Sequence, residues 1–229
     1  MAGFPVHIRA VFFDVVGTVL FPDPPAPTVY ADVARRGGIN TTSAEIRARF
    51  VEAYNAEEAI DRAAGWITSE KRERNRWQNI VAATLRGVAD PEICFQQLYE
   101  HFGKPTSWQL ATDIERVISA LHERGIIVGL GTNYDSRLWS VLDGFPELAP
   151  LRERTVISSI VGFRKPAAEF FQKVVELAAC EPGEVLFVGD DLENDFLGAT
   201  AGGLEARLLD VNQSYTIPKT IGRLVDLIS

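Results

Sequence analysis

The first apolar run of the chain ends in a single carboxylate, and this arrangement constrains the fold more than any other feature. The run covers residues 8–16 and carries Asp14 near its end, followed by Gly17 and Thr18. Buried parallel strands are near-continuous apolar runs, and α/β proteins build their sites beyond the carboxyl ends of such strands. A carboxylate held there can act as a nucleophile, although capping a turn is the alternative role for Asp14.

Four more apolar runs have the length of short strands, and amphipathic segments lie between the later ones. The expected strands cover residues 126–131, 155–158, 185–189 and 205–209, and the expected helices cover 113–124, 136–144, 166–179, 191–201 and 218–227. Pro166 and Pro218 each suit the first turn of a helix. Strands that alternate with helices of this length predict an α/β fold with a doubly wound, mostly parallel sheet.

Residues 22–104 break this alternation. The proline-rich segment 22–27 is predicted to be a hinge or flap, because it can continue neither a strand nor a helix. Only helical periods follow, over residues 43–64 with Ser43 as N-cap, 69–85 and 91–102. We therefore expect an all-helical cap domain of residues 22–104, inserted into a core domain of residues 1–21 and 105–229.

The composition limits the function classes. The net charge is −8, and no run of Lys and Arg rises above the acidic background, which argues against a nucleic-acid-binding surface. Cys94 and Cys180 are too few and too far apart for a disulfide scaffold, so we expect free thiols in a reducing cytosol. We expect the N-terminal residues to form neither a signal peptide nor a membrane span. We expect a cytoplasmic protein that binds neither nucleic acid nor membranes.

Three further polar groups follow expected strands or precede an expected helix. Thr132 and Asn133 come after the second strand, where a hydroxyl and backbone N–H groups can bind phosphate, unless they form a plain turn. Lys165 could neutralise phosphate and orient Asp14, or be a solvated loop lysine. The acidic residues at 190–195 follow the 185–189 strand and offer the hard oxygen ligands that suit Mg²⁺.

Together these residues resemble the four motifs of the haloacid dehalogenase-like (HAD) hydrolase superfamily. Residues 13–18, 132–133, 165–166 and 189–195 are similar to its motifs one to four. The position of the helical insert is similar to the cap of the subgroup that carries it after motif one. Trp77, Trp108 and residues 132–138 resemble the branch named after rhythmically expressed gene products. The resemblance implies a Rossmann-like core with a mobile cap.

The resemblance also implies roles for individual residues. Asp14 would be the nucleophile that forms an aspartyl-phosphate with a small phosphorylated substrate. Lys165 and Thr132 would hold the phosphate, with Thr18 and Asn133 beside them. The cofactor would be Mg²⁺, held by Asp14, the backbone carbonyl of Val16, Asp190, Asp191 and Asp195, either directly or through water.

Val16 stands where the family carries a second Asp, which acts as general acid and base. Removing one such group typically lowers the rate about 10²–10⁴-fold. The chain could therefore hydrolyse only phosphates with activated leaving groups, or take its acid from Asp23, Asp135 or His101. The alternatives are a phosphate-binding pseudoenzyme, a phosphonatase that uses Lys71 in the cap, and a dehalogenase, against which Asp190 and Asp191 argue.

The cap leaves the choice of substrate open. Helical spacing places Trp77 with Ile80 and Val81 in the core of the cap rather than in a pocket. Its arginines are expected to be solvated. Substrate contact is the alternative for the tryptophans and arginines of this region, which are Trp66, Trp77, Arg72, Arg74 and Arg76.

Overall fold

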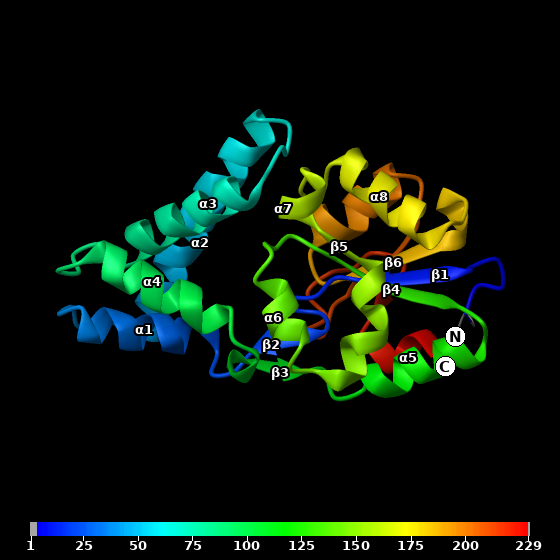
Figure 1. The fold of residues 1–229 in the computed structure, drawn as a ribbon, viewed down its shortest axis with the longest axis horizontal. Coiled ribbons are helices and arrows are strands. Elements are labelled where there is room, and N and C mark those ends of the chain that lie inside the picture. Colours follow the sequence, from blue (N-terminus) through cyan, green and yellow to red (C-terminus); the bar gives the residue numbers. More distant parts are fainter. Residues whose placement is uncertain (1–3, 229) are drawn as a thin grey trace.

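The computed structural model describes residues 4–228 and places a parallel sheet at the centre of the core domain (Figure 1). The strand order is β5-β4-β1-β6-β7-β8, and every neighbouring pair is parallel. Five of these strands lie within or overlap the predicted apolar runs, so the predicted α/β fold is confirmed. They are β1 (Ala10–Phe13), β4 (Ile127–Thr132), β5 (Thr155–Ile157), β6 (Val185–Gly189) and β7 (Glu205–Leu209).

Helices cover both faces of this sheet because successive strand residues point to opposite sides. Phe13 packs with α5 (Ile114–Glu123) and the 3₁₀ helix Leu224–Ile228, whereas Phe12 packs with α8 (Ala168–Ala178) and α9 (Gly198–Ala201). Figure 1 shows α5 and α8 on opposite sides of the strands. The core also contains two short α-helices, α6 (Leu138–Leu142) and α7 (Ser158–Val161), and the 3₁₀ helix Pro146–Arg154.

Four helices form the cap between the two halves of the core, and local sequence explains where they begin. They are α1 (Ala26–Arg36), α2 (Ser43–Ala63), α3 (Glu70–Thr84) and α4 (Pro91–Phe102). Thr42, rather than the predicted Ser43, caps α2 in a reciprocal capping box with Glu45. Ser69 accepts from the N–H of Arg72, and Asp90 accepts from the N–H of Ile93.

The proline-rich segment differs from the prediction. Strand β2 (Leu20–Pro22) runs into it and pairs antiparallel with β3 (Trp108–Leu110) at the base of the cap. Helix α1 then begins at Ala26, with Pro27 in its first turn. The expectation that this segment continues neither a strand nor a helix was wrong, because Pro22 ends a strand and Pro27 lies in a first helical turn, where the missing N–H has no helical partner anyway. The hinge itself stays a prediction.

The C-terminal segment also differs. A helix over residues 218–227 was predicted, but Thr220–Ile221 forms β8, which pairs with β7, and a 3₁₀ helix follows only at Leu224. The free edge of β7 offered unpaired backbone groups, and pairing with them outweighed local helical preference. Pro166 likewise lies before α8, which begins at Ala168. Within residues 4–228, no helix has both the length and the apolar character needed to cross a bilayer.

Candidate active site

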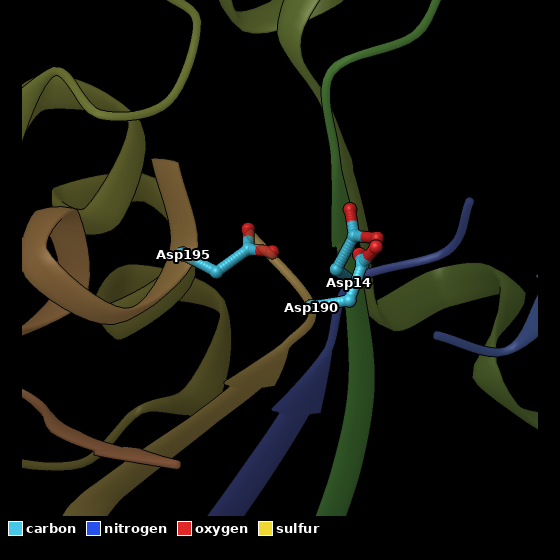
Figure 2. A group of neighbouring side chains, drawn as sticks. All are labelled: Asp14, Asp190 and Asp195. Carbon is cyan, nitrogen blue, oxygen red and sulfur yellow. The ribbon is translucent and has the colours of Figure 1, made fainter. Parts of the chain in front are cut away.

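The sequence-predicted residues meet at one edge of the sheet. Asp14 follows β1, Thr132 ends β4 and Asp190 follows β6, and these three strands are adjacent and parallel. Asp195 lies on the π-helical turn Leu192–Leu197 after β6. Figure 2 shows its carboxylate pointing toward those of Asp14 and Asp190.

Lys165 is buried at the centre of this group. Its Nζ donates to Asp14 Oδ1 at 2.6 Å, to Asp195 Oδ1 at 2.6 Å and to the carbonyl of Gly131 at 3.1 Å. Only 2% of the residue is exposed, so the solvated-loop alternative is wrong. Burial lowers its pKa, but the Asp14 and Asp195 carboxylates raise it further, and the net pKa lies above the usual value. The ammonium form is therefore kept.

Asn133 fixes the backbone that carries this lysine. Its Oδ1 accepts from the N–H of Lys165 at 2.8 Å, and its Nδ2 donates to the Lys165 carbonyl at 3.1 Å. The amide group thus positions Lys165 from both sides. The side chain also borders the cavity described below, so its predicted phosphate contact stays a prediction.

Ligand oxygens of Asp14, Asp190 and Asp195 lie within 4.8 Å of one another. Burial raises the pKa of Asp14 to about 6 and that of Asp195 to about 7, although the Lys165 charge opposes both shifts. The pKa of Asp190 rises to about 6 through lost hydration and the Asp195 charge, although part of this residue is exposed to solvent. Three crowded carboxylates that hold protons this tightly, beside only one ammonium, are a donor set that fits a hard divalent cation.

Two glycines allow the carboxylates to come this close. Gly17 has φ +96°, and a Cβ on it would lie 2.4 Å from Asp190 Oδ2. A Cβ on Gly189 would lie 2.1 Å from Asp195 Oδ2. Thr18, fully buried, donates from Oγ1 to Asp190 Oδ1 at 3.3 Å, so its hydroxyl contacts the acidic cluster.

The Asp191 side chain caps the helical turn that follows it. Its Oδ1 accepts from the N–H groups of Glu193 and Asn194 at 2.9 and 2.8 Å, and its Oδ2 accepts from the Asn194 side chain. These bonds cap the π-helical turn that carries Asp195. The Asp191 side chain still borders the cavity, and its predicted role at the metal stays a prediction.

A cavity of about 360 Å³ lies between the core and the cap, beside Asp14 and Lys165. Val16 borders it, with Thr132 on the core side and Trp77 on the cap side. Trp77 also packs against the apolar cluster of the cap, as predicted, so it belongs to both the cap core and the cavity wall. This geometry places the Asp14 carboxylate, the Lys165 ammonium group and two further carboxylates, Asp190 and Asp195, at one end of a single pocket.

A model of the haloacid dehalogenase-like hydrolases matches residues 8–203. The chain belongs to this family. It is 29% identical over 212 residues to human haloacid dehalogenase-like hydrolase domain-containing protein 3, covering 89% of this chain and 82% of the relative. It is 24% identical over 206 residues to glyceraldehyde 3-phosphate phosphatase of Methanothermobacter thermautotrophicus, covering 89% and 86%. A solved L-2-haloacid dehalogenase shares the fold, with a TM-score of 0.74 at 17% identity over 96% of this chain and 97% of that one.

The predicted family is thus confirmed. In this hydrolase the structure also shows where the three candidates for the general acid missing at Val16 lie. Asp23, Asp135 and His101 are absent from the described lining of the cavity. Asp135 is fully buried and accepts two hydrogen bonds from the guanidinium of Arg137, at 2.7 Å each, and a third from its backbone N–H at 3.1 Å. Lys71, the phosphonatase candidate, is exposed on α3 and is likewise absent from that lining.

Sequence reasoning missed a buried ion cluster in the cap of the hydrolase. The predicted solvation of the arginines was wrong for Arg76, which is fully buried and donates to Asp61 at 2.8 Å. Arg72 binds the same carboxylate, and Arg74 lies over the rings of Phe95 and Tyr99. We call the following residues the cap ion cluster: Glu57, Glu58, Asp61, Arg72, Glu73, Arg76 and Arg164. The acidic residues at 57, 58 and 61 were the sequence feature that could have indicated this cluster.

Proposed function

We propose that this hydrolase is a Mg²⁺-dependent phosphatase that uses Asp14 as nucleophile and accepts small substrates with good leaving groups. The observation that carries the proposal is the pairing of Asp14 with Lys165 inside a three-carboxylate cluster, beside a cavity where Val16 offers no proton donor. Phosphatase activity of a relative adds support. The free thiols of Cys94 and Cys180 support a cytoplasmic setting.

The residues divide the work as follows. Lys165 holds Asp14 Oδ1 and orients the carboxylate, while its charge and the Thr132 hydroxyl bind the phosphoryl oxygens. The Asp14–phosphorus bond forms as the bond from phosphorus to the leaving oxygen breaks, and water then splits the aspartyl-phosphate to release phosphate. Asp14, Asp190 and the Val16 carbonyl would hold Mg²⁺, supported by Asp191 and Asp195, and the cation would neutralise phosphate charge.

The apolar Val16 side chain limits which substrates react. The leaving oxygen departs without a proton from this position, so it must be stable as an anion. Acyl and aryl phosphates meet this condition, whereas alkyl phosphates lose the general-acid contribution of about 10²–10⁴-fold. We therefore expect activated substrates to be turned over and ordinary alkyl phosphates to react poorly.

The test is phosphate release from acetyl phosphate and p-nitrophenyl phosphate, with Mg²⁺ or with excess EDTA. Wild type is compared with Asp14→Asn, which keeps the size of the side chain and removes the nucleophilic carboxylate. Mg²⁺-dependent release that disappears in Asp14→Asn is the expected result. Equal release by both proteins would overturn the proposal and favour a phosphate-binding protein without catalysis.

A further inference from the structure

The cavity beside Asp14 is rich in aromatic side chains, most of which come from the cap. Tyr30 of α1, Phe50 and Tyr54 of α2, Trp77 of α3 and Phe95 of α4 all border it. A cavity of this kind, apolar with a few polar groups at one end, is typical of sites for small organic ligands. The catalytic residues supply that polar end.

These rings are packed against one another. Phe50 contacts Tyr30 edge-on at a centroid distance of 5.6 Å, stacks on Tyr54 at 6.0 Å and lies 6.4 Å from Trp77. Ring pairs at these distances stabilise each other's orientation. The wall is therefore formed before a ligand binds, and it offers flat apolar surfaces at fixed positions.

Away from the polar end near Asp14, the described cavity lining offers no free charge. Apart from Asp14, Lys165 and the acidic residues at 190–195, the charged residue of that lining is Arg137. Its guanidinium is bound by Asp135 and lies 3.4 Å from the ring centroid of Tyr99. A second phosphate or a carboxylate on the substrate would therefore lose its hydration there without gaining a free cation.

We propose that the substrate is a phosphate ester of an aromatic hydroxyl compound, with its ring against the wall formed by Tyr30, Phe50, Tyr54 and Trp77. This inference rests on the proposed phosphatase function and names its substrate class. The cavity volume of about 360 Å³ is near the lower end of small-ligand sites, which suits one or two fused rings.

The chemistry at Val16 points independently to the same class. A phenolic hydroxyl has a pKa of about 10, so its oxygen leaves as a phenoxide far more readily than an aliphatic alcohol leaves as an alkoxide. In the reaction, the bond from Asp14 to phosphorus forms and the bond to the phenolic oxygen breaks. The phenoxide takes its proton from solvent after it leaves, and no general acid at Val16 is needed.

The test measures kcat/KM for 2-naphthyl phosphate, phenyl phosphate and acetyl phosphate with Mg²⁺. Naphthyl and phenyl esters have leaving groups of similar acidity, so a difference between them reports contact with the ring. We expect a higher kcat/KM for the naphthyl ester than for the phenyl ester. In Trp77→Leu, the ratio of naphthyl to acetyl phosphate kcat/KM should fall at least about fivefold, as expected for lost ring contact.

The matched control is Trp139→Leu, another half-buried tryptophan, which is absent from the described cavity lining. It should leave both the ratio and the individual rates unchanged. If Trp77→Leu does not fold, as judged by circular dichroism, Tyr54→Leu takes its place. Asp14-dependent acetyl phosphate hydrolysis without a naphthyl preference would overturn this inference and leave the phosphatase proposal standing. Absence of hydrolysis of all three compounds would overturn both.

Discussion

Arg164 and Lys165 are adjacent in the chain, yet their buried side chains enter different domains. The Lys165 ammonium binds Asp14 in the core, while the Arg164 guanidinium binds Glu73 of α3 and Glu58 of α2 in the cap. One peptide bond separates the two residues. The Arg164 contacts therefore attach the segment that carries Lys165 to the cap.

The turn between α2 and α3 strengthens this attachment. The N–H of Thr68 donates to the Gly162 carbonyl at 2.9 Å, and the N–H of Arg164 donates to the Trp66 carbonyl at 2.9 Å. Figure 1 shows this end of the α2–α3 hairpin extending toward α7, away from the β2–β3 junction. The cap is thus held to the core at two separate places.

Arg164→Ala should destabilise the protein strongly. Removing one partner of a buried ion pair leaves uncompensated charge, at Glu73 above all, and typically costs about 3–5 kcal/mol. The control is Arg152→Ala, because the Arg152–Asp143 pair is exposed and should contribute about 0–1 kcal/mol. Urea unfolding of both variants measures the difference. Similar losses in the two variants would show that the Arg164 contacts contribute little.

Val16→Asp should broaden the substrate range. A carboxyl group at this position borders the cavity and could protonate the leaving oxygen, so turnover of alkyl phosphates should rise by about 10²–10⁴-fold. Val16→Asn is the matched control, since it has nearly the same size and cannot transfer the proton. Steady-state phosphate release from glycerol phosphate measures the effect. Equal rates for the two variants would argue against a missing acid as the limiting feature.

Gly17→Ala should displace the Asp190 carboxylate of the acidic cluster, in addition to straining the backbone at residue 17. The new Cβ would meet the Asp190 carboxylate, whereas Gly38→Ala introduces a Cβ at φ +91° with nothing within 4 Å. Both variants carry similar strain, so the difference reports the contact with Asp190. We expect Mg²⁺ affinity, measured by calorimetry, to fall in Gly17→Ala and to stay unchanged in Gly38→Ala. A fall in both would assign the effect to strain in the fold.

Mg²⁺ binding should weaken as the pH falls below about 7. The pKa values of Asp14 and Asp190 are raised to about 6 and that of Asp195 to about 7, so protons compete with the cation. Each displaced proton should lower affinity about tenfold per pH unit below its pKa. Calorimetric titration at pH 5 and pH 8 measures this dependence. The same affinity at both values would contradict ligation by these carboxylates.

The raised pKa values of these three carboxylates also determine how the free energy of unfolding of the metal-free protein changes with pH. The raised pKa values mean that the folded protein holds these protons more tightly than the unfolded chain does. The carboxylates therefore lower the free energy of unfolding as pH rises from about 4 to about 7. Added Mg²⁺ should restore it, so the rise in Tm on adding Mg²⁺ should be larger at pH 8 than at pH 5. Thermal unfolding with and without Mg²⁺ checks this.

The sequence by itself determined the sheet, the helical insert and the residues that meet at Asp14. Buried parallel strands need uninterrupted apolar runs, and the carboxyl ends of such strands meet at one edge, so Asp14, Thr132 and Asp190 could be placed together from the pattern alone. The predictions for the segment at Pro22 and for a helix from Pro218 were wrong, because pairing with strands distant in the sequence determined the structure of both regions.

Only the tertiary structure decided what surrounds these residues. Helical period alone did not show that Trp77 also borders a cavity, or that Arg76 and Arg164 lie buried among carboxylates from two helices. Such contacts join residues far apart in the chain, and whether a charge is solvated or paired depends on what the fold packs against it. The local sequence pattern identifies Asp14 and the motifs around it, whereas the long-range packing of the cap on the core forms the aromatic cavity.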